Sequence, residues 1–185
     1  MILSVAILAL VTLQRLGELA LARRNTARLL ARGGVETGAG HYPLIVALHA
    51  GWLGGLWALG WDRPAGLGSL AVYGVLQVLR IWTLASLGER WTTRIISLPD
   101  EPLVRRGPYR FFPHPNYAVV AGEIAVLPLV FGLPLYAAVF SVLNALVLTV
   151  RISAEVRALG GRPGLTRGRS APASGRSPGP PPRTG

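Results

Sequence analysis

The sequence predicts an all-α integral membrane protein with about five transmembrane helices. Its 185 residues are 51% hydrophobic and only 15% charged, with a mean hydropathy of +0.44, whereas a typical soluble domain has roughly 25% charged residues. The apolar residues gather in long blocks. Because spanning a bilayer takes about 20 helical residues, blocks of this kind indicate membrane helices.

Five apolar blocks predict the helices in chain order. They cover about residues 2–22, 43–61, 67–87, 116–131 and 135–150. The first block contains Gln14, Arg15 and Glu18 and lacks a basic start, which is atypical of a cleaved signal peptide, so we expect it to remain as a helix. The first three blocks are long enough to cross a bilayer. The last two are short and separated by only three residues, so we expect a tight helical hairpin, and the sequence leaves open whether its two helices fully cross.

The arginines between these blocks predict the orientation in the membrane. All 19 basic residues are Arg, and sixteen lie in the loop after the first block, the loop after the third or the C-terminal tail, against Arg63 alone on the other side. The positive-inside rule places the N-terminus outside, with the 88–114 loop and the tail in the cytoplasm of a multi-pass cell-membrane protein. The net charge of +11 does not indicate nucleic-acid binding, because the basic residues alternate with apolar blocks.

The chain divides into a membrane domain and a tail. Residues 1–159 form the predicted domain, with a cofactor-binding core at about 75–159. Residues 160–185 are rich in Gly, Pro, Ser and Arg, a composition that predicts a disordered cytoplasmic tail. The chain has neither Cys nor Lys, which excludes disulfides, thiolate chemistry and Schiff bases. His41 and His49 offer too few ligands for a metal, and we expect His49 to bond to another helix.

Ionisable residues inside membrane helices are costly and therefore candidates for function. Arg15 and Glu18, three residues apart on one helix face, either neutralise each other or line a polar cavity. We expect Arg80, two turns from a helix end, to extend towards the membrane surface. Glu123 has no basic residue within four positions, so it requires a partner on another helix, a ligand or a proton. We interpret Glu123 as a pocket residue.

A polar cluster is expected where the fourth helix begins and the fifth ends. Pro115 suits the first position of a helix, and the free N–H groups of that first turn favour an anion such as a carboxylate. Arg151 and Glu155 share one helix face, and a hairpin returns them to the level of His114. The combination suits a polar zwitterionic ligand presented to a lipid-phase partner.

Three motifs in this order resemble the isoprenylcysteine carboxyl methyltransferase family. They are Leu-Val-Arg-Arg-Gly-Pro-Tyr from Leu103, His-Pro-Asn-Tyr from His114, and Arg-x-x-x-Glu from Arg151. The resemblance covers about residues 75–160 and implies an integral membrane enzyme that uses S-adenosylmethionine. It implies that Arg151 lies towards the acceptor, and it implies these cofactor contacts: Leu103, Val104, Tyr109, His114, Pro115, Asn116, Tyr117 and Glu155. Pro113 stands where the family often has Arg.

Three further motifs are Gln14-Arg-Leu-Gly-Glu18, His41-Tyr-Pro-Leu and Trp91-Thr-Thr-Arg94. With them, the N-terminal part resembles a bacterial branch associated with type III polyketide synthases. This implies methyl transfer to an oxygen of an alkylpyrone or phenolic lipid, with the lipophilic acceptor entering from the bilayer and the cofactor from the cytoplasm. Glu123 or His114 would serve as base for a phenol. Two alternatives stay open at this point: a methyltransferase of prenylated or phospholipid substrates, and a small non-enzymatic membrane protein.

Overall fold

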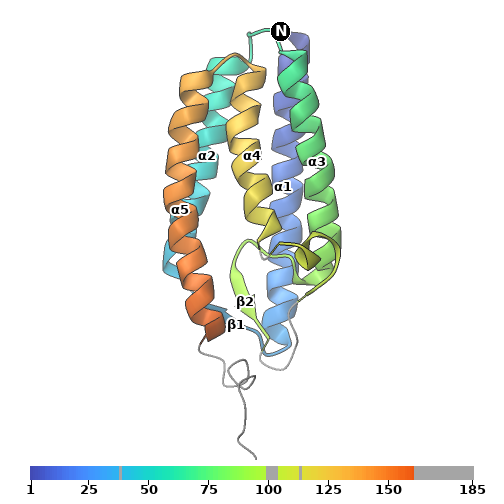
Figure 1. The fold of residues 1–185 in the computed structure, drawn as a ribbon, viewed down its shortest axis with the longest axis vertical. Coiled ribbons are helices and arrows are strands. Elements are labelled where there is room, and N and C mark those ends of the chain that lie inside the picture. Colours follow the sequence, from blue (N-terminus) through green and yellow to red (C-terminus); the bar gives the residue numbers. More distant parts are fainter. Residues whose placement is uncertain (38, 99–103, 113, 161–185) are drawn as a thin grey trace, which may run out of the picture.

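The structure is a computed structural model that describes residues 1–37, 39–98, 104–112 and 114–160. The side chains of His41 and of residues 155–160 lie outside this description. Five helices run along the long axis of the molecule (Figure 1): α1 (Ile2–Ala31), α2 (Tyr42–Gly60), α3 (Leu67–Leu87), α4 (Pro115–Val130) and α5 (Pro134–Gly160). The predicted all-α integral membrane fold is confirmed.

Two helices extend well beyond their apolar blocks. α1 continues from residue 22 to Ala31, and α5 continues from residue 150 to Gly160. Hydropathy indicates only the part of a helix that contacts lipid. Arg and Ala, which follow both apolar blocks, have high helix propensity, so the helices continue past those blocks. As a result α1, α2, α3 and α5 are all long and apolar enough to cross a membrane, while α4, with 16 residues, is shorter. The expected shortness of the last two helices therefore holds for α4 and is wrong for α5.

Two short strands join loops that are far apart in the sequence. β1 (Val35–Thr37) pairs antiparallel with β2 (Ile95–Ser97), so that Val35 lies opposite Ser97. Strands of three residues are too short for a periodic sequence pattern, and the sequence analysis did not predict them. The pair lies at the end of the bundle where α4 begins and α5 ends (Figure 1). We call this the strand end.

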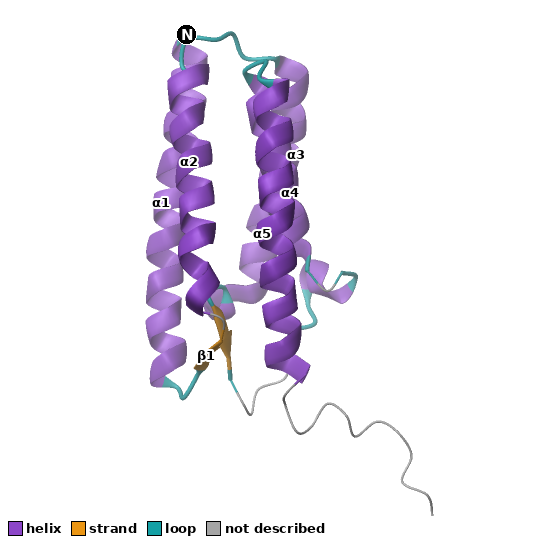
Figure 2. Cartoon of the chain, turned by 90° about the vertical axis from the view of Figure 1, so that its left-hand side faces the viewer, coloured by secondary structure: helices purple, strands orange, loops and turns teal. Residues whose placement is uncertain are grey.

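The bundle is apolar at the end opposite the strands. Figure 2 shows α1 and α2 as a pair on one side, with α3, α4 and α5 grouped on the other. A buried cluster fills the space between the two groups: Leu8, Val11, Trp52, Leu56, Tyr73, Ile124, Leu127, Val130 and Phe131. Ser4 donates a hydrogen bond to the backbone oxygen of Arg63 and so fixes the start of α1 to the loop between α2 and α3.

Polar side chains also join the helices in this half. Trp57 Nε1 of α2 donates to Thr12 Oγ1 of α1 at 3.0 Å, and Tyr136 Oη of α5 donates to the backbone oxygen of Trp52 at 2.9 Å. The second contact depends on Gly55, because a Cβ at this position would lie 2.2 Å from Tyr136 Oη. A glycine is therefore needed for α2 and α5 to approach this closely.

We predict that Gly55→Ala destabilises the bundle by about 1–3 kcal/mol, the usual cost of adding a methyl group where no space exists. Gly54→Ala is the matched control, because a Cβ there meets nothing within 4 Å and Ala is the better helix former. Thermal unfolding of both variants in detergent measures the difference. Equal stability of the two variants would contradict the close α2–α5 contact.

Candidate functional site

The loop between α3 and α4 is held against the end of α1. Asn25, which is 2% exposed, donates from Nδ2 to the backbone oxygens of Gly88 at 3.2 Å and Trp91 at 2.8 Å. Trp91 is itself buried, and its Nε1 has no hydrogen-bond partner among the described residues. One buried amide thus fixes the start of the segment that leads to β2.

The next residues of this segment contact the start of α2. Thr93 Oγ1 lies 3.2 Å from Tyr42 Oη. The guanidinium of Arg94 lies 4.8 Å from the centroid of the Tyr42 ring and also pairs with Glu36 of β1 at 3.0 Å. The ring of Tyr42 and the β1–β2 pair therefore hold the backbone of Thr93 in a defined position.

The N-terminus of α4 faces the same region. Pro115 occupies the first helical position, as the sequence predicts, and His114 precedes it as N-cap without a side-chain cap bond. The rings of His114 and Tyr117 stack, with centroids 5.2 Å apart and planes 16° from parallel. Asn116 Oδ1 is buried without a partner in the described part of the chain. The N–H groups of Tyr117 and Ala118 donate to the backbone oxygen of His114, and Pro115 has no N–H, so the N–H of Asn116 is the donor that this helix start can offer to a ligand. The helix start therefore combines this donor with an aromatic stack and an amide oxygen that no described group satisfies.

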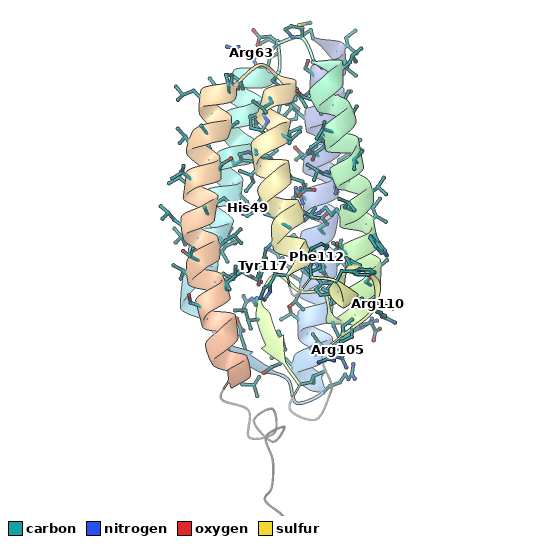
Figure 3. All side chains as sticks on the ribbon, viewed as in Figure 1. His49, Arg63, Arg105, Arg110, Phe112 and Tyr117 are labelled. Carbon is teal, nitrogen blue, oxygen red and sulfur yellow. The ribbon has the colours of Figure 1, made fainter. Side chains whose placement is uncertain are left out.

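Arg151 of α5 joins these elements. Its side chain is largely buried, and its Nε donates to Tyr117 Oη at 2.9 Å while its Nη1 donates to the backbone oxygen of Thr93 at 2.8 Å. Figure 3 shows Tyr117 between α4 and α5 close to the strands. Both described oxygens that accept from Arg151 are uncharged, so among the described residues no carboxylate neutralises its guanidinium.

A separate network of four charged side chains lies deeper in the bundle, between α1, α3 and α4. Arg80 donates to Glu18 at 2.5 and 2.6 Å and to Glu123 at 2.7 Å. Arg15 donates to the same two carboxylates, at 2.9 Å to Glu18 and 2.8 Å to Glu123. Two positive charges balance two negative ones, which reduces the cost of burying all four in a membrane bundle. We call these four residues the ion network.

Two glutamines complete the ion network. Gln14 donates from Nε2 to Glu18 at 2.9 Å and to Gln77 at 2.8 Å, and Gln77 in turn donates to Glu123 at 2.8 Å. The carboxylate of Glu123 thus accepts hydrogen bonds from two guanidiniums and one amide. The partner on another helix that the sequence required for Glu123 is this pair of arginines.

The structure corrects two expectations about these membrane residues. Arg80 does not extend towards the membrane surface, and it is only 6% exposed. Two carboxylates within hydrogen-bond distance stabilise its charge inside the bundle, so the side chain does not need to reach the membrane surface two helical turns away. Among the described residues, the hydrogen bond of His49 stays within its own helix and does not reach another one, since its Nδ1 lies 2.8 Å from the backbone oxygen of Ile45. Arg15 and Glu18 do pair with each other, as part of the larger network.

The predicted site residues fall into three groups. His114, Pro115, Asn116, Tyr117 and Arg151 meet at the strand end. Glu123 lies eight residues after Pro115, about 12 Å further along the helix axis, and belongs to the ion network. Tyr109 lies in a hollow on the outer side of α3, with Val104 half-buried nearby in the chain.

The remaining predicted residues fall outside the description. Leu103 lies among residues 99–103, and Glu155 has a described backbone in α5 but no described side chain. Pro113 is likewise outside the described residues.

The sequence assigned no site role to four residues that the structure places near it: Asn25, Trp91, Thr93 and Asn144. Trp91 and Thr93 entered only as part of the motif Trp91-Thr-Thr-Arg94 in the resemblance to the bacterial branch. Asn144 is 2% exposed on α5 and lies seven residues, or two helical turns, before Arg151 on the same face. An asparagine in an otherwise apolar membrane helix is a signal for function or packing. For Trp91 and Thr93, whose contacts depend on how the loop folds back, the composition carries no such signal.

Comparison with known proteins identifies one relative and one family. The chain is 40% identical over 158 residues, 83% of its own length and 94% of the relative's, to the uncharacterized protein YpbQ of Bacillus subtilis (strain 168). The sequence pattern of the isoprenylcysteine carboxyl methyltransferase (ICMT) family matches residues 69–160. No solved structure matches the chain. The matched residues include α4, α5 and the whole loop before them.

We predict that Arg80→Gln destabilises the protein by about 3–5 kcal/mol, because it leaves a buried carboxylate without compensating charge. The double variant Arg80→Gln with Glu18→Gln restores neutrality and should recover part of this loss. Thermal unfolding in detergent, read by helical circular dichroism, compares the two variants with the parent chain. A double variant no more stable than Arg80→Gln alone would show that charge balance does not govern this network.

Proposed function

Because the chain belongs to the isoprenylcysteine carboxyl methyltransferase family, a family of membrane methyltransferases, we propose that it transfers the methyl group of S-adenosylmethionine to an oxygen of a lipophilic acceptor. An alkylpyrone or a phenolic lipid is the proposed acceptor. The observation that carries this proposal is the set of buried polar groups at the strand end, where a fixed arginine and the open end of a helix lie together.

The described residues of the strand end fit a polar cofactor. Asn116 Oδ1 is a buried acceptor and Trp91 Nε1 a buried donor, and neither has a described partner. Buried polar atoms are rarely left unsatisfied, so a ligand with both donors and acceptors would complete them. The N–H of Asn116 in the first turn of α4 would donate to the cofactor's carboxylate. The stacked rings of His114 and Tyr117 would provide aromatic surface for it.

The bound cofactor supplies an electrophilic methyl group carried on a sulfonium. The task of the chain is then to align an acceptor oxygen and to exclude water. Arg151 suits this task, because its charge faces the site while Tyr117 and Thr93 fix its orientation. Among the predicted contacts, Leu103, Val104, Tyr109 and Glu155 remain proposed cofactor residues, with Glu155 one helical turn beyond Arg151.

The acceptor would reach Arg151 from the bilayer, between the helices. Asn144, two turns deeper on the same face of α5, places a second buried polar group along this path. Its amide would bind the polar head of the acceptor, while the alkyl tail stays among apolar side chains. We place the strand end in the cytoplasm and the N-terminus outside, because the arginines of the loops and tail gather on that side.

The geometry narrows the choice of a general base. Glu123 is bonded to Arg15, Arg80 and Gln77, so it would have to give up an arginine before it could accept a proton. His114 lies at the site itself. An acceptor that is already ionised, such as an enolic pyrone, needs no base, and we propose this class as the preferred substrate.

We predict that the purified chain binds S-adenosylmethionine saturably, and that His114→Ala and Asn116→Leu each weaken binding about 2- to 10-fold, the value of one or two hydrogen bonds. His49→Ala is the control, because the described hydrogen bond of His49 stays within α2. Isothermal titration in detergent measures all four affinities. Absence of binding by a well-folded parent chain would overturn the proposed cofactor and favour the non-enzymatic alternative.

We predict that the methylation rate of a long-chain alkylpyrone is nearly constant between about pH 6 and pH 9, because its enol is ionised throughout. The rate with a 5-alkylresorcinol should rise over this range, since a phenol ionises only near pH 10. Transfer of a labelled methyl group in bilayers measures both profiles, with N-acetyl-S-farnesylcysteine as the test of the prenylated alternative. A pyrone rate that rises with pH over this range, and loses this rise in His114→Ala, would instead identify His114 as a base.

A further inference from the structure

The segment 104–112 forms a fixed platform on the outer side of α3. Arg106 Nε donates to the backbone oxygen of Ser86 at 2.6 Å. Gly107 has a φ of +57°, and a Cβ on it would lie 2.0 Å from Ser86 Oγ and 3.2 Å from Trp82 Nε1. Only a glycine lets the backbone lie this close to the helix. The short helix η3 (Gly107–Arg110) then turns the chain outwards over the buried Pro108.

This platform packs against the side of α3, at the level of its last turns. Trp82 and Ser86 belong to the last turn and a half of α3, which is long and apolar enough to cross a membrane. Figure 2 shows the segment projecting from α3 on the side away from the two strands. Trp82 is 47% exposed on this side. Exposed tryptophan near the end of a membrane helix is typical of the boundary between hydrocarbon and headgroups.

The outer surface of the platform combines exposed aromatic rings with arginines. A hollow of about 510 Å³ is lined by Arg105, Tyr109, Arg110, Phe111 and Phe112. Phe111 and Phe112 are 68% and 65% exposed, and the guanidinium of Arg110 lies 5.7 Å from the centroid of the Phe111 ring. Figure 3 shows Arg105, Arg110 and Phe112 on this outer surface, with Tyr117 on the inner side of α4. The hollow is therefore distinct from the Arg151–Tyr117 contact.

None of the five described residues that line the hollow is acidic and two are arginines, so these residues favour an anion. Arginine binds phosphate oxygens through paired N–H donors, while two adjacent phenylalanines gain free energy by contact with acyl chains. A nucleic acid or a soluble anion would satisfy the arginines and leave both rings in water. A lipid phosphate at the membrane boundary satisfies both kinds of group.

We propose that this hollow is a binding site for the headgroup of an anionic glycerophospholipid. Arg105 and Arg110 hold the phosphate, and Phe111 and Phe112 lie against the acyl chains of the same lipid. The site includes Tyr109, which is also a proposed cofactor residue, but it lies apart from Arg151 and Tyr117, and it fixes the loop before α4 at a set depth in the membrane.

The test uses Trp82 as a reporter next to the platform. The full chain is placed in phosphatidylcholine bilayers that contain either brominated phosphatidylglycerol or brominated phosphatidylcholine at equal mole fraction. Subtracting the quenching of the same chain with Trp82→Phe isolates the signal of Trp82 from the other tryptophans. We expect stronger quenching by phosphatidylglycerol, and we expect Arg105→Gln with Arg110→Gln to lower this preference about fivefold for each arginine removed.

A matched control removes the same charge elsewhere. Arg23→Gln with Arg24→Gln changes two exposed arginines of α1 that do not line the hollow, and it should keep the preference. Phe111→Ser with Phe112→Ser should lower quenching by both lipids, and thermal unfolding in detergent checks that each variant folds.

Several outcomes would overturn the proposal. They are an unchanged preference in the Arg105–Arg110 variant, an equal loss in the α1 control, and absence of Trp82 quenching by either lipid, as expected if water or a protein covers the hollow. Displacement of phosphatidylglycerol by inorganic phosphate in the buffer would show that the arginines bind free phosphate, and it would also overturn the lipid assignment.

Discussion

The ion network is the constraint on which the rest of the bundle depends. Two arginines and two glutamates from α1, α3 and α4 lie within hydrogen-bond distance of one another inside a membrane protein. Each charge is tolerated there only because the opposite charge is present, since an isolated ion in this environment is costly. The relative positions of the three helices are thus set by a requirement for neutrality. The apolar cluster on one side of this layer could tolerate a small shift of α1, whereas the network could not.

The same neutrality separates the interior of the bundle from the strand end. The network bonds both of its carboxylates to arginines, while Arg151 bonds to a phenol and a backbone oxygen. A guanidinium whose described partners are all neutral retains its attraction for an anion, and its low exposure strengthens that attraction. The strand end is therefore the place where a negatively charged oxygen is best stabilised. This is the electrostatic reason for preferring an enolate or carboxylate acceptor over a neutral one.

Much of this arrangement could be predicted from the sequence, because it follows from local patterns. Apolar blocks located all five helices, and Pro115 marked the start of α4 to the residue. The predicted position of Arg80 at the membrane surface was wrong because it was inferred from the distance of Arg80 to the end of its own helix. The carboxylates that hold Arg80 lie on two other helices, α1 and α4. The strand pair and the contact of Asn25 with Gly88 and Trp91 were not predicted, for the same reason. Each depends on two segments more than 55 positions apart, and no local pattern reports such a distance. His114 and Tyr117 could be grouped because they share one helix start.

The strand end has two arginine sites, and an anionic lipid could in principle bind at either. The burial of Arg151 distinguishes its site from that of Arg105 and Arg110. Arg105 and Arg110 are exposed on the outer side of α3, open to any anionic headgroup in the surrounding bilayer. Arg151 is 9% exposed, among helices that also contribute Tyr117 and Asn144. A phospholipid phosphate is compact, strongly hydrated and attached to two chains, so moving it to Arg151 would require dehydration of a concentrated charge and space for a second chain. A planar enolate spreads its charge over a ring and carries one chain, so the cost of its dehydration is lower. The depth of Arg151 thus favours the acceptor proposed here over the phospholipids that surround it.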